Sequence, residues 1–202
     1  MTLKFAGLLA FAGAAALGLV AWLALDEPQL AASGGARPPL AGSVANFTPF
    51  DPPRPIEQAG FVDGEERAVT LGDFEGRVLL VNFWATWCGP CKEEMPSLDR
   101  LEGEMGGEDF QVVAVSVDEG GLPAVDRFYS MLGLENLATY LDPTGEFADA
   151  LKLTALPTTV LVDRDGRALG ALVGPAEWDS PEAKALIRYY MERDGAGITS
   201  PT

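Results

Sequence analysis

The two cysteines of the chain, Cys88 and Cys91, lie three positions apart in the stretch 82-NFWATWCGPCKEEMPSL-98. Thiols at this spacing could form a structural disulfide, part of a metal site, or a redox couple. A disulfide across so short a loop constrains little of the unfolded chain, which disfavours a stabilising role. A zinc site needs about four ligands, and the chain has two thiols and no histidine, unless two chains share a site. The redox couple is therefore the favoured interpretation.

The segments on either side of the pair also favour redox chemistry. The apolar run 78-VLLVNFW-84 predicts a buried strand that leads into the pair, and the residues from Cys88 to about Met105 predict a helix. Cys88 would lie at the helix N-terminus, where free N–H groups and the helix dipole stabilise a thiolate and lower its pKa. We expect Cys88 to be the exposed nucleophile and Cys91, one turn on, to resolve the mixed disulfide.

Composition narrows the classes of function. The 14 basic and 30 acidic residues give a formal net charge of -16, which argues against binding to nucleic acid or to an anionic lipid surface. We expect the acidic residues to form a solvated surface. The chain contains no histidine, which excludes Ser-His-Asp and Cys-His hydrolytic schemes in their usual form. Hydrophobic residues make up 48% of the chain, as expected for a globular core.

The N-terminal part of the sequence predicts a membrane anchor. Residues 5–25 carry no charge and, at about 1.5 Å per residue, would span the hydrocarbon core as a helix. Lys4 precedes the run and Asp26 follows it, so the N-terminus is expected in the cytoplasm and the remainder outside. We predict a retained anchor over residues 1–27, with a cleaved signal peptide as the alternative. The Pro- and Gly-rich residues 28–55 predict a linker.

Residues 56–194 predict one folded domain, followed by a polar tail at 195–202. Strands alternate with helices, which indicates an α/β fold with a mainly parallel central sheet, and a late hairpin adds antiparallel strands. The expected elements in chain order are a hairpin at 60–70, a helical turn at 71–75, a strand at 78–84, a helix at 88–105, a strand at 111–118, a helix at 123–132, a strand at 137–141, a helix at 143–153, a hairpin at 158–174 and a helix at 181–193.

The stretch 83-FWATWCGPCKEEMPSL-98 resembles the thioredoxin fold, and specifically its membrane-anchored extracytoplasmic branch of TlpA-like and ResA-like thiol–disulfide oxidoreductases. A second match, 154-TALPTTVLVDRDGR-167, places Pro157 where thioredoxins carry a cis-proline that faces the cysteine pair. The insertion at 120–152 and the segment 174-GPAEWDSPEA-183 also look like this branch. The resemblance covers about residues 56–194 and implies a central mixed sheet flanked by helices. We expect no cofactor, and the small number of possible ligands also disfavours a metal.

The resemblance also assigns expected roles to residues near the pair. ResA-like proteins carry a glutamate at the position of Glu94, so we expect Glu94 to handle the proton of Cys91; the alternative is a solvated helix glutamate, like Glu93. Asn82 replaces the buried aspartate of cytosolic thioredoxin and is expected to be a hydrogen-bonded strand residue. The residues expected to bind the substrate are Trp87, Gly89, Pro90, Leu156 and Pro157. Trp84 is expected in the core, and the carboxylates of 163-DRDG-166 in a turn.

The dipeptide Gly89-Pro90 between the cysteines is typical of reductants in this family, whereas strongly oxidising members carry a histidine there. We therefore expect a reduction potential nearer the thioredoxin value of about -270 mV than the DsbA value of about -120 mV. The resemblance implies an inner-membrane protein with a periplasmic domain and a membrane electron donor of the DsbD or CcdA kind. It implies client proteins with cysteine pairs, such as apocytochrome c or copper-delivery proteins. The alternatives are a Cu(I)-binding metallochaperone and a thiol peroxidase on a similar fold.

Overall fold

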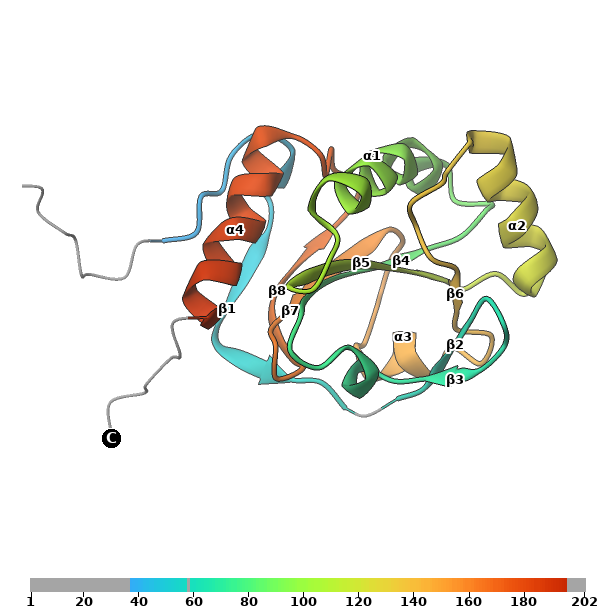
Figure 1. Cartoon of the computed structure of the whole chain (residues 1–202), viewed down its shortest axis with the longest axis horizontal. Helices are drawn as coiled ribbons and strands as arrows, with labels where there is room; N and C mark the ends of the chain where they lie inside the picture. Colours follow the sequence, from blue (N-terminus) through green and yellow to red (C-terminus); the bar gives the residue numbers. More distant parts are fainter. Residues whose placement is uncertain (1–36, 58, 196–202) are drawn as a thin grey trace, which may run out of the picture. The chain divides into compact units, whose positions relative to one another are not determined.

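An eight-stranded mixed sheet organises the residues that the computed structural model describes, which are 37–57 and 59–195 (Figure 1). Its strand order is β1-β8-β7-β4-β5-β6-β2-β3. The strands are β1 (Thr48–Pro55), β2 (Phe61–Asp63), β3 (Ala68–Val69), β4 (Val78–Trp84), β5 (Phe110–Ser116), β6 (Tyr140–Leu141), β7 (Thr158–Val162) and β8 (Arg167–Val173). The helices are η1 (Gly42–Val44), η2 (Leu71–Phe74), α1 (Gly89–Met105), α2 (Gly121–Leu132), α3 (Glu146–Ala150) and α4 (Pro181–Gly195).

The centre of the sheet is the strand that leads to the cysteines. β4 pairs in parallel with β5 and antiparallel with β7, so Asn82 lies opposite both Ala114 and Thr159. Every residue of β4 is buried, because secondary structure covers both faces of the sheet. Successive side chains point to opposite faces: Trp84 belongs to one core cluster and Phe83 to the other. The mixed α/β class and the thioredoxin-type arrangement expected from the sequence are confirmed. The expectation of a mainly parallel sheet is wrong: among the described strands only β4–β5 and β5–β6 pair in parallel, because β1, β2, β3 and the β7–β8 hairpin all add antiparallel pairs.

Helices occupy the two faces unequally. In Figure 1, α1, α2 and α4 lie over one face of the sheet, and the short α3 and η2 lie over the other. The first core cluster accordingly joins residues of β4 to Met95 of α1, Phe128 of α2 and Leu186 of α4. The second cluster contains Phe147 of α3 and Phe74 of η2. The face that carries α3 is thus covered by less helix, which leaves room there for cavities.

The proline-rich residues 48–55, expected in the linker, form strand β1 instead. β1 pairs antiparallel with β8, with Thr48 opposite Ala171 and Pro55 opposite Arg167, and its register shifts between Pro49 and Arg54. Proline lacks the N–H that a central strand needs, but an edge strand tolerates it, and β1 is an edge of this sheet. The expected domain boundary at residue 56 is therefore wrong.

The folded domain also includes η1 and the residues after it, where two apolar side chains enter the core. Val44 is 0% exposed and Phe47 is 3% exposed. The centroid of the Phe47 ring lies 6.1 Å from the centroid of the Tyr190 ring on α4. The second half of the predicted linker, from about residue 42, is thus part of the domain.

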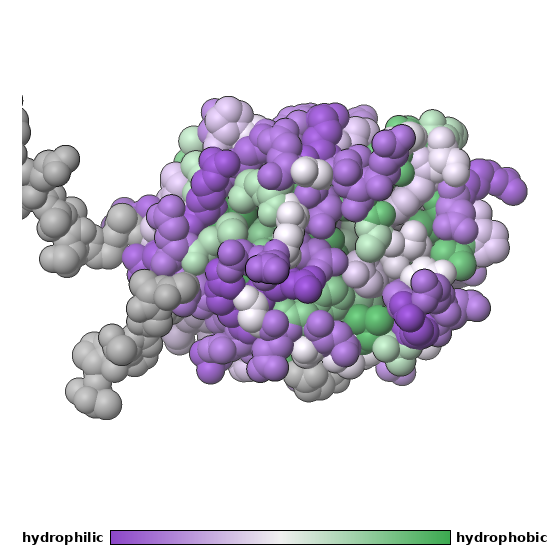
Figure 2. Space-filling model, in the orientation of Figure 1, coloured by the Kyte–Doolittle hydropathy of each residue, from purple (hydrophilic) through white to green (hydrophobic). Residues whose placement is uncertain are grey.

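The predicted anchor at 1–27, the first part of the linker and the tail beyond residue 195 lie outside the described residues. Within the described part of the chain, no helix has both the length and the hydrophobicity to cross a membrane. The face drawn in Figure 2 is mostly hydrophilic, and hydrophobic residues appear on it in separate patches. That picture agrees with the solvated surface expected from a net charge of -16.

The contact between β1 and β8 yields a prediction about stability. A Cβ at Gly170 would lie 2.5 Å from two ring carbons of Phe47 and 2.7 Å from the Thr48 carbonyl oxygen. Gly170→Ala must therefore displace a buried ring or the edge strand, and we expect the free energy of unfolding to fall by about 1–3 kcal/mol. Urea unfolding measures this change.

Gly107→Ala is the matched control, because a Cβ at Gly107 would meet no atom within 4 Å. It should change the free energy of unfolding by about 0.5 kcal/mol or less. Equal stability of the two variants would contradict the assigned role of the β1–β8 contact.

Candidate active site

Cys88 and Cys91 are joined by a disulfide with an S–S length of 2.04 Å and a Cα–Cα distance of 5.3 Å. Cys88 is 6% exposed and Cys91 is 0% exposed. Cys88 is thus the more exposed of the two, as expected, and it lines a cavity that opens to solvent. The exposure of Cys88 is nevertheless far smaller than we expected, so a partner must reach its sulfur through that cavity.

The local sequence explains why the helix begins at the pair. Cys88 is the N-cap of α1, with extended backbone angles, and Pro90 lies in the first turn, where its missing N–H costs no hydrogen bond. The Cys91 backbone N–H donates to Cys88 Sγ at 3.3 Å. In the reduced protein the same donor and the helix dipole would stabilise a Cys88 thiolate. The helix start thus supplies the activation that a histidine supplies elsewhere.

A cavity of about 660 Å³ lies in front of Cys88, and we call it the cysteine groove. Four residues expected to bind the substrate line it: Trp87, Gly89, Pro90 and Leu156. Trp87 is 68% exposed. Segments far apart in the sequence close the groove on the other side, namely Val117, α3 and residues 153–156.

The Leu156–Pro157 peptide is cis, which confirms the expectation for this bond. Pro157 itself is buried and is not part of the groove wall. Its carbonyl oxygen accepts a hydrogen bond of 2.9 Å from the Gly174 N–H at the end of β8. This contact fixes the loop before β7, so Leu156 stays at the wall opposite Cys88.

Glu94 is the second chemically notable group near the pair. Its side chain is 1% exposed, so the alternative of a solvated helix glutamate is wrong, whereas its neighbour Glu93 is exposed. Glu94 Oε1 accepts a hydrogen bond of 2.7 Å from Asn82 Nδ2. Its Oε2 accepts from the Ala176 N–H at 3.1 Å and from the Trp178 indole N–H at 3.2 Å. The carboxylate therefore joins α1, β4 and the segment before α4.

Burial raises the pKa of Glu94 to about 7, while the hydrogen bonds from Asn82, Ala176 and Trp178 oppose the rise. A carboxyl group with this pKa can take up or release a proton near neutral pH. Asn82 is hydrogen-bonded, as expected, but its partners were not foreseen. Its Nδ2 also donates to Thr159 Oγ1 at 2.9 Å, and its Oδ1 has no partner among the described residues.

Two residues of this region were not foreseen. Trp178 lies in the segment 174-GPAEWDSPEA-183, for which the sequence predicted no role beyond its family resemblance. Its indole is fully buried and donates a hydrogen bond to Glu94. Asp118 is 5% exposed and accepts hydrogen bonds from the Thr86 N–H at 2.8 Å and the Thr86 hydroxyl at 2.6 Å. It also accepts from Ser116 Oγ at 2.8 Å. Asp118 thus holds the loop that leads to Cys88.

The position of Asp118 in the sequence offered a usable signal. Asp118 follows strand β5, and the cysteine loop follows the adjacent parallel strand β4. Carboxyl ends of neighbouring parallel strands meet at one edge of a sheet, so a polar residue there is a candidate partner for the loop. Trp84 is fully buried, which confirms the core position expected for it. The Asp163 carboxylate accepts hydrogen bonds from the N–H groups of Asp165 and Arg167, which confirms the turn expected at 163-DRDG-166.

Comparison with known proteins gives consistent matches. The Redoxin family model matches residues 43–187. ResA thiol-disulfide oxidoreductase of Bacillus thuringiensis subsp. konkukian is 32% identical over 131 residues, which cover 65% of this chain and 71% of that protein. ResA of Bacillus subtilis is 30% identical over 138 residues, which cover 68% of this chain and 73% of that protein.

Solved structures give the same picture. A candidate DsbE-type thiol:disulfide interchange protein from Chlorobium tepidum superposes with a TM-score of 0.61 and 27% identity, covering 69% of this chain and 96% of the other. A thioredoxin family thiol:disulfide interchange protein from Chlorobium tepidum TLS gives a TM-score of 0.57 and 25% identity, with coverage of 69% and 97%. Fold, sequence and site geometry therefore point to the same chemistry.

The burial of Glu94 predicts a pH dependence of stability. In the unfolded chain Glu94 ionises near the ordinary glutamate pKa of 4.5, whereas in the folded protein it holds its proton to about pH 7. Rising pH between these values therefore favours the unfolded state. Relative to Glu94→Gln, the oxidised wild-type protein should lose about 3 kcal/mol of unfolding free energy from pH 4.5 to pH 7. Urea unfolding across this range measures the difference.

Glu93→Gln is the control, because Glu93 is the exposed neighbour on the same helix. Its pH dependence should follow that of the wild-type protein. If the unfolding free energies of the wild-type and Glu94→Gln proteins differ by the same amount at every pH from 4.5 to 7, Glu94 ionises normally in the folded state and the prediction is wrong.

Proposed function

The chain belongs to the Redoxin family and, within it, to the TlpA/ResA group of thiol–disulfide oxidoreductases, and from this premise we propose that it reduces disulfides of client proteins outside the cytoplasm. The observation that carries the proposal is the placement of Cys88 at the N-terminus of α1, at the bottom of the cysteine groove and bonded to Cys91. Thiol–disulfide oxidoreductase activity follows from the family. The direction of electron flow, the client and the compartment are the proposal.

The reaction is a dithiol–disulfide exchange in two steps. The Cys88 thiolate attacks one sulfur of the client disulfide, which forms a mixed disulfide and releases the other client sulfur as a thiolate. Cys91 then loses its proton and attacks Cys88 Sγ, which releases the second client thiolate. The client gains two electrons, and the protein is left with the Cys88–Cys91 disulfide that the structure contains.

Glu94 is proposed as the group that accepts the proton of Cys91 in the second step. Cys91 is fully buried, and so is Glu94, which follows it by one turn of α1. Cys91 must become a thiolate to attack, and its burial in apolar surroundings disfavours that charge. A carboxylate with a pKa of about 7 has an affinity for the proton that suits the exchange at neutral pH. Asn82 and Trp178 would then hold Glu94 in position.

The walls of the cysteine groove are proposed to bind the client around its disulfide. Trp87, Gly89 and Pro90 would contact it on the helix side, and Leu156 on the side of the cis-peptide. Pro157 would act by holding the backbone of Leu156 in place. Trp87 suits this role because a large aromatic side chain exposed to 68% is available to a partner.

A reductase in an oxidising compartment must be re-reduced, because its disulfide form accumulates with each turnover. We propose a membrane electron donor of the DsbD or CcdA kind, an N-terminal anchor over residues 1–27, and a periplasmic location for the domain. The proposed clients are apocytochrome c or copper-delivery proteins with cysteine pairs. The support for these proposals is the uncharged run at residues 5–25 and the resemblance to ResA-like proteins.

The reduction potential of the cysteine pair tests the direction of electron flow. The Gly89-Pro90 dipeptide supplies no histidine to stabilise the Cys88 thiolate, so the reduced form should be less favoured than in strong oxidants. We expect a potential below about -210 mV for the full-length protein equilibrated with glutathione or dithiothreitol buffers. A value above about -150 mV would make the protein an oxidant or an isomerase instead.

The proposed role of Glu94 predicts a kinetic defect with a particular pH profile. Glu94→Gln should slow resolution of the mixed disulfide by on the order of 10²-fold at pH 7, because Gln cannot accept the Cys91 proton. The defect should shrink toward high pH, where hydroxide ionises Cys91 directly. Stopped-flow reduction of a disulfide peptide measures the rate.

Glu93→Gln again provides the control and should keep the wild-type rate, since Glu93 faces solvent. A Glu94→Gln protein whose rates match the wild-type rates across the pH range would remove Glu94 from the mechanism and leave it a structural role.

A further inference from the structure

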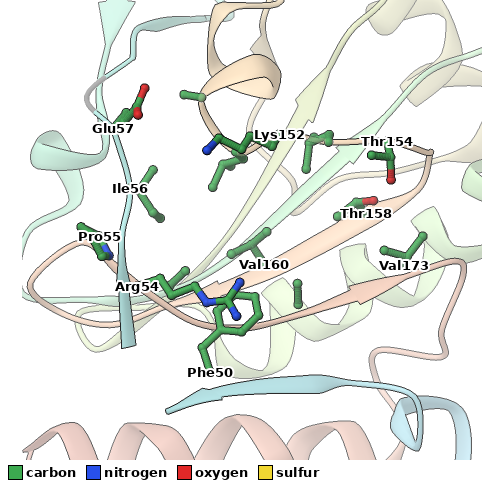
Figure 3. Close-up of a pocket in the computed structure, with 15 residues that line it drawn as sticks. Phe50, Arg54, Pro55, Ile56, Glu57, Lys152, Thr154, Thr158, Val160 and Val173 are labelled. Carbon is green, nitrogen blue, oxygen red and sulfur yellow. The ribbon is translucent and has the colours of Figure 1, made fainter. Parts of the chain in front are cut away.

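A second cavity lies beside the cysteine groove, and we call it the cationic cavity (Figure 3). Its volume is about 330 Å³, comparable to that of a small ligand site. Its floor comes from β7 and β8, at Val160 and Ala171, on the sheet face that carries α3. Its sides come from the end of β1 and from the segment that follows α3. The mechanism proposed above does not use this cavity.

The lining combines apolar side chains with an excess of positive charge. Arg54 and Lys152 are the two cations of the wall, and Glu57 is its one carboxylate. Figure 3 shows Arg54 at the end of β1, beside the ring of Phe50, and Lys152 on the segment after α3. The cysteine groove, by comparison, has Asp149 as its one charged lining residue. The charge of this wall is thus opposite in sign to the net charge of -16 of the chain.

Both cations are available to a ligand. Arg54 and Lys152 are exposed, and neither forms an ion pair within residues 37–57 and 59–195. The Arg54 guanidinium carbon lies 3.9 Å from the centroid of the Phe50 ring, which orients the group without neutralising it. Lys152 follows the C-terminus of α3 with a φ of 54°, and the N–H groups of Lys152 and Leu153 donate to the Asp149 and Ala148 carbonyls, so the left-handed backbone caps the helix and fixes the place of Lys152.

The cationic cavity and the cysteine groove share part of their walls. Leu153 and Thr154 line both, and Thr158, which lines the cationic cavity, follows the cis-peptide directly. A polypeptide whose disulfide lies at Cys88 can therefore continue past Leu153 into the second cavity. This continuity favours the client chain as the occupant over an unrelated small molecule.

We propose that the cationic cavity binds the segment of the client that flanks its disulfide, and that it selects segments in which apolar and acidic residues alternate. Apolar side chains would contact Val160 and Ala171, and carboxylates would pair with Arg54 and Lys152. Arg54 suits this task because its planar guanidinium can hold a carboxylate through two hydrogen bonds. The inference rests on the proposed function, and it adds a sequence preference for the client.

The test compares matched peptides that differ only in charge. Each peptide carries one intrachain disulfide and one flanking segment, which is Leu-Asp-Leu-Glu in the acidic peptide and Leu-Asn-Leu-Gln in the neutral peptide. In one pair of peptides this segment precedes the disulfide, and in a second pair it follows the disulfide. The rate constant for oxidation of the reduced full-length protein in mild detergent should be about fivefold higher for the acidic peptide in at least one pair. Long-range repulsion from a chain of net charge -16 predicts the opposite order.

Variants then locate the preference. The Arg54→Gln/Lys152→Gln protein should lose it, because the neutral side chains cannot pair with the carboxylates. Arg188→Gln should keep it, because Arg188 is an exposed cation on α4, which covers the opposite face of the sheet (Figure 1). The wild-type preference should also disappear in about 1 M salt, a measurement that does not depend on how any variant folds.

Equal rates for the acidic and neutral peptides would overturn the inference, as would a preference that survives the double substitution or high salt. Hydroxyethyl disulfide, which has no flanking chain, separates this failure from failure of the proposed function. If it oxidises the reduced protein while the peptides show no preference, the reductase stands and the cationic cavity has no role in selecting clients. If neither hydroxyethyl disulfide nor any of the peptides oxidises the reduced protein, both proposals fall.

Discussion

The buried carboxylate of Glu94 is the interaction on which the arrangement of the site depends. It joins α1, which carries the cysteines, to the preceding strand β4 through Asn82, and to the distant segment before α4 through Ala176 and Trp178. Ser97, one turn on, reinforces the same contact, because its hydroxyl donates to the Glu94 carbonyl at 2.7 Å and accepts from the Trp178 N–H at 3.0 Å. The helix that positions Cys88 is therefore held to the sheet by polar contacts as well as by apolar packing.

Such a group destabilises the fold whenever it is ionised, since its burial outweighs the three hydrogen bonds that favour the charge. The same burial brings its pKa to about 7, where a proton can pass between a carboxyl group and a thiol without a large difference in affinity. A histidine would titrate in this range without burial, but the chain contains none. The core thus gives a glutamate the acid–base behaviour for which other proteins use an imidazole.

The place of the cysteine groove follows from the direction of the sheet. β4 and β5 run in parallel and end together, so the cysteine loop and Asp118 meet at one edge, where Asp118 holds Thr86 through two hydrogen bonds. The cis-peptide before β7 closes the groove from the other side. Because α3 is short, the sheet face beyond it stays partly open, and that opening forms the cationic cavity. Reaction and recognition are thus arranged side by side on one scaffold.

Local features of the sequence were sufficient to predict the strand–cysteine–helix unit, the two hairpins and the last residues of α1 and α2, because each depends on neighbours a few residues away. The run 78-VLLVNFW-84 and the turn 163-DRDG-166 are of this kind. The tertiary structure decided what depends on distant partners. Residues 48–55 became a strand because β8 offers a pairing edge, and Glu94 became a buried acid because Trp178, 84 positions away, lies against it. No local pattern contains such information, since burial and pairing are properties of the folded chain as a whole.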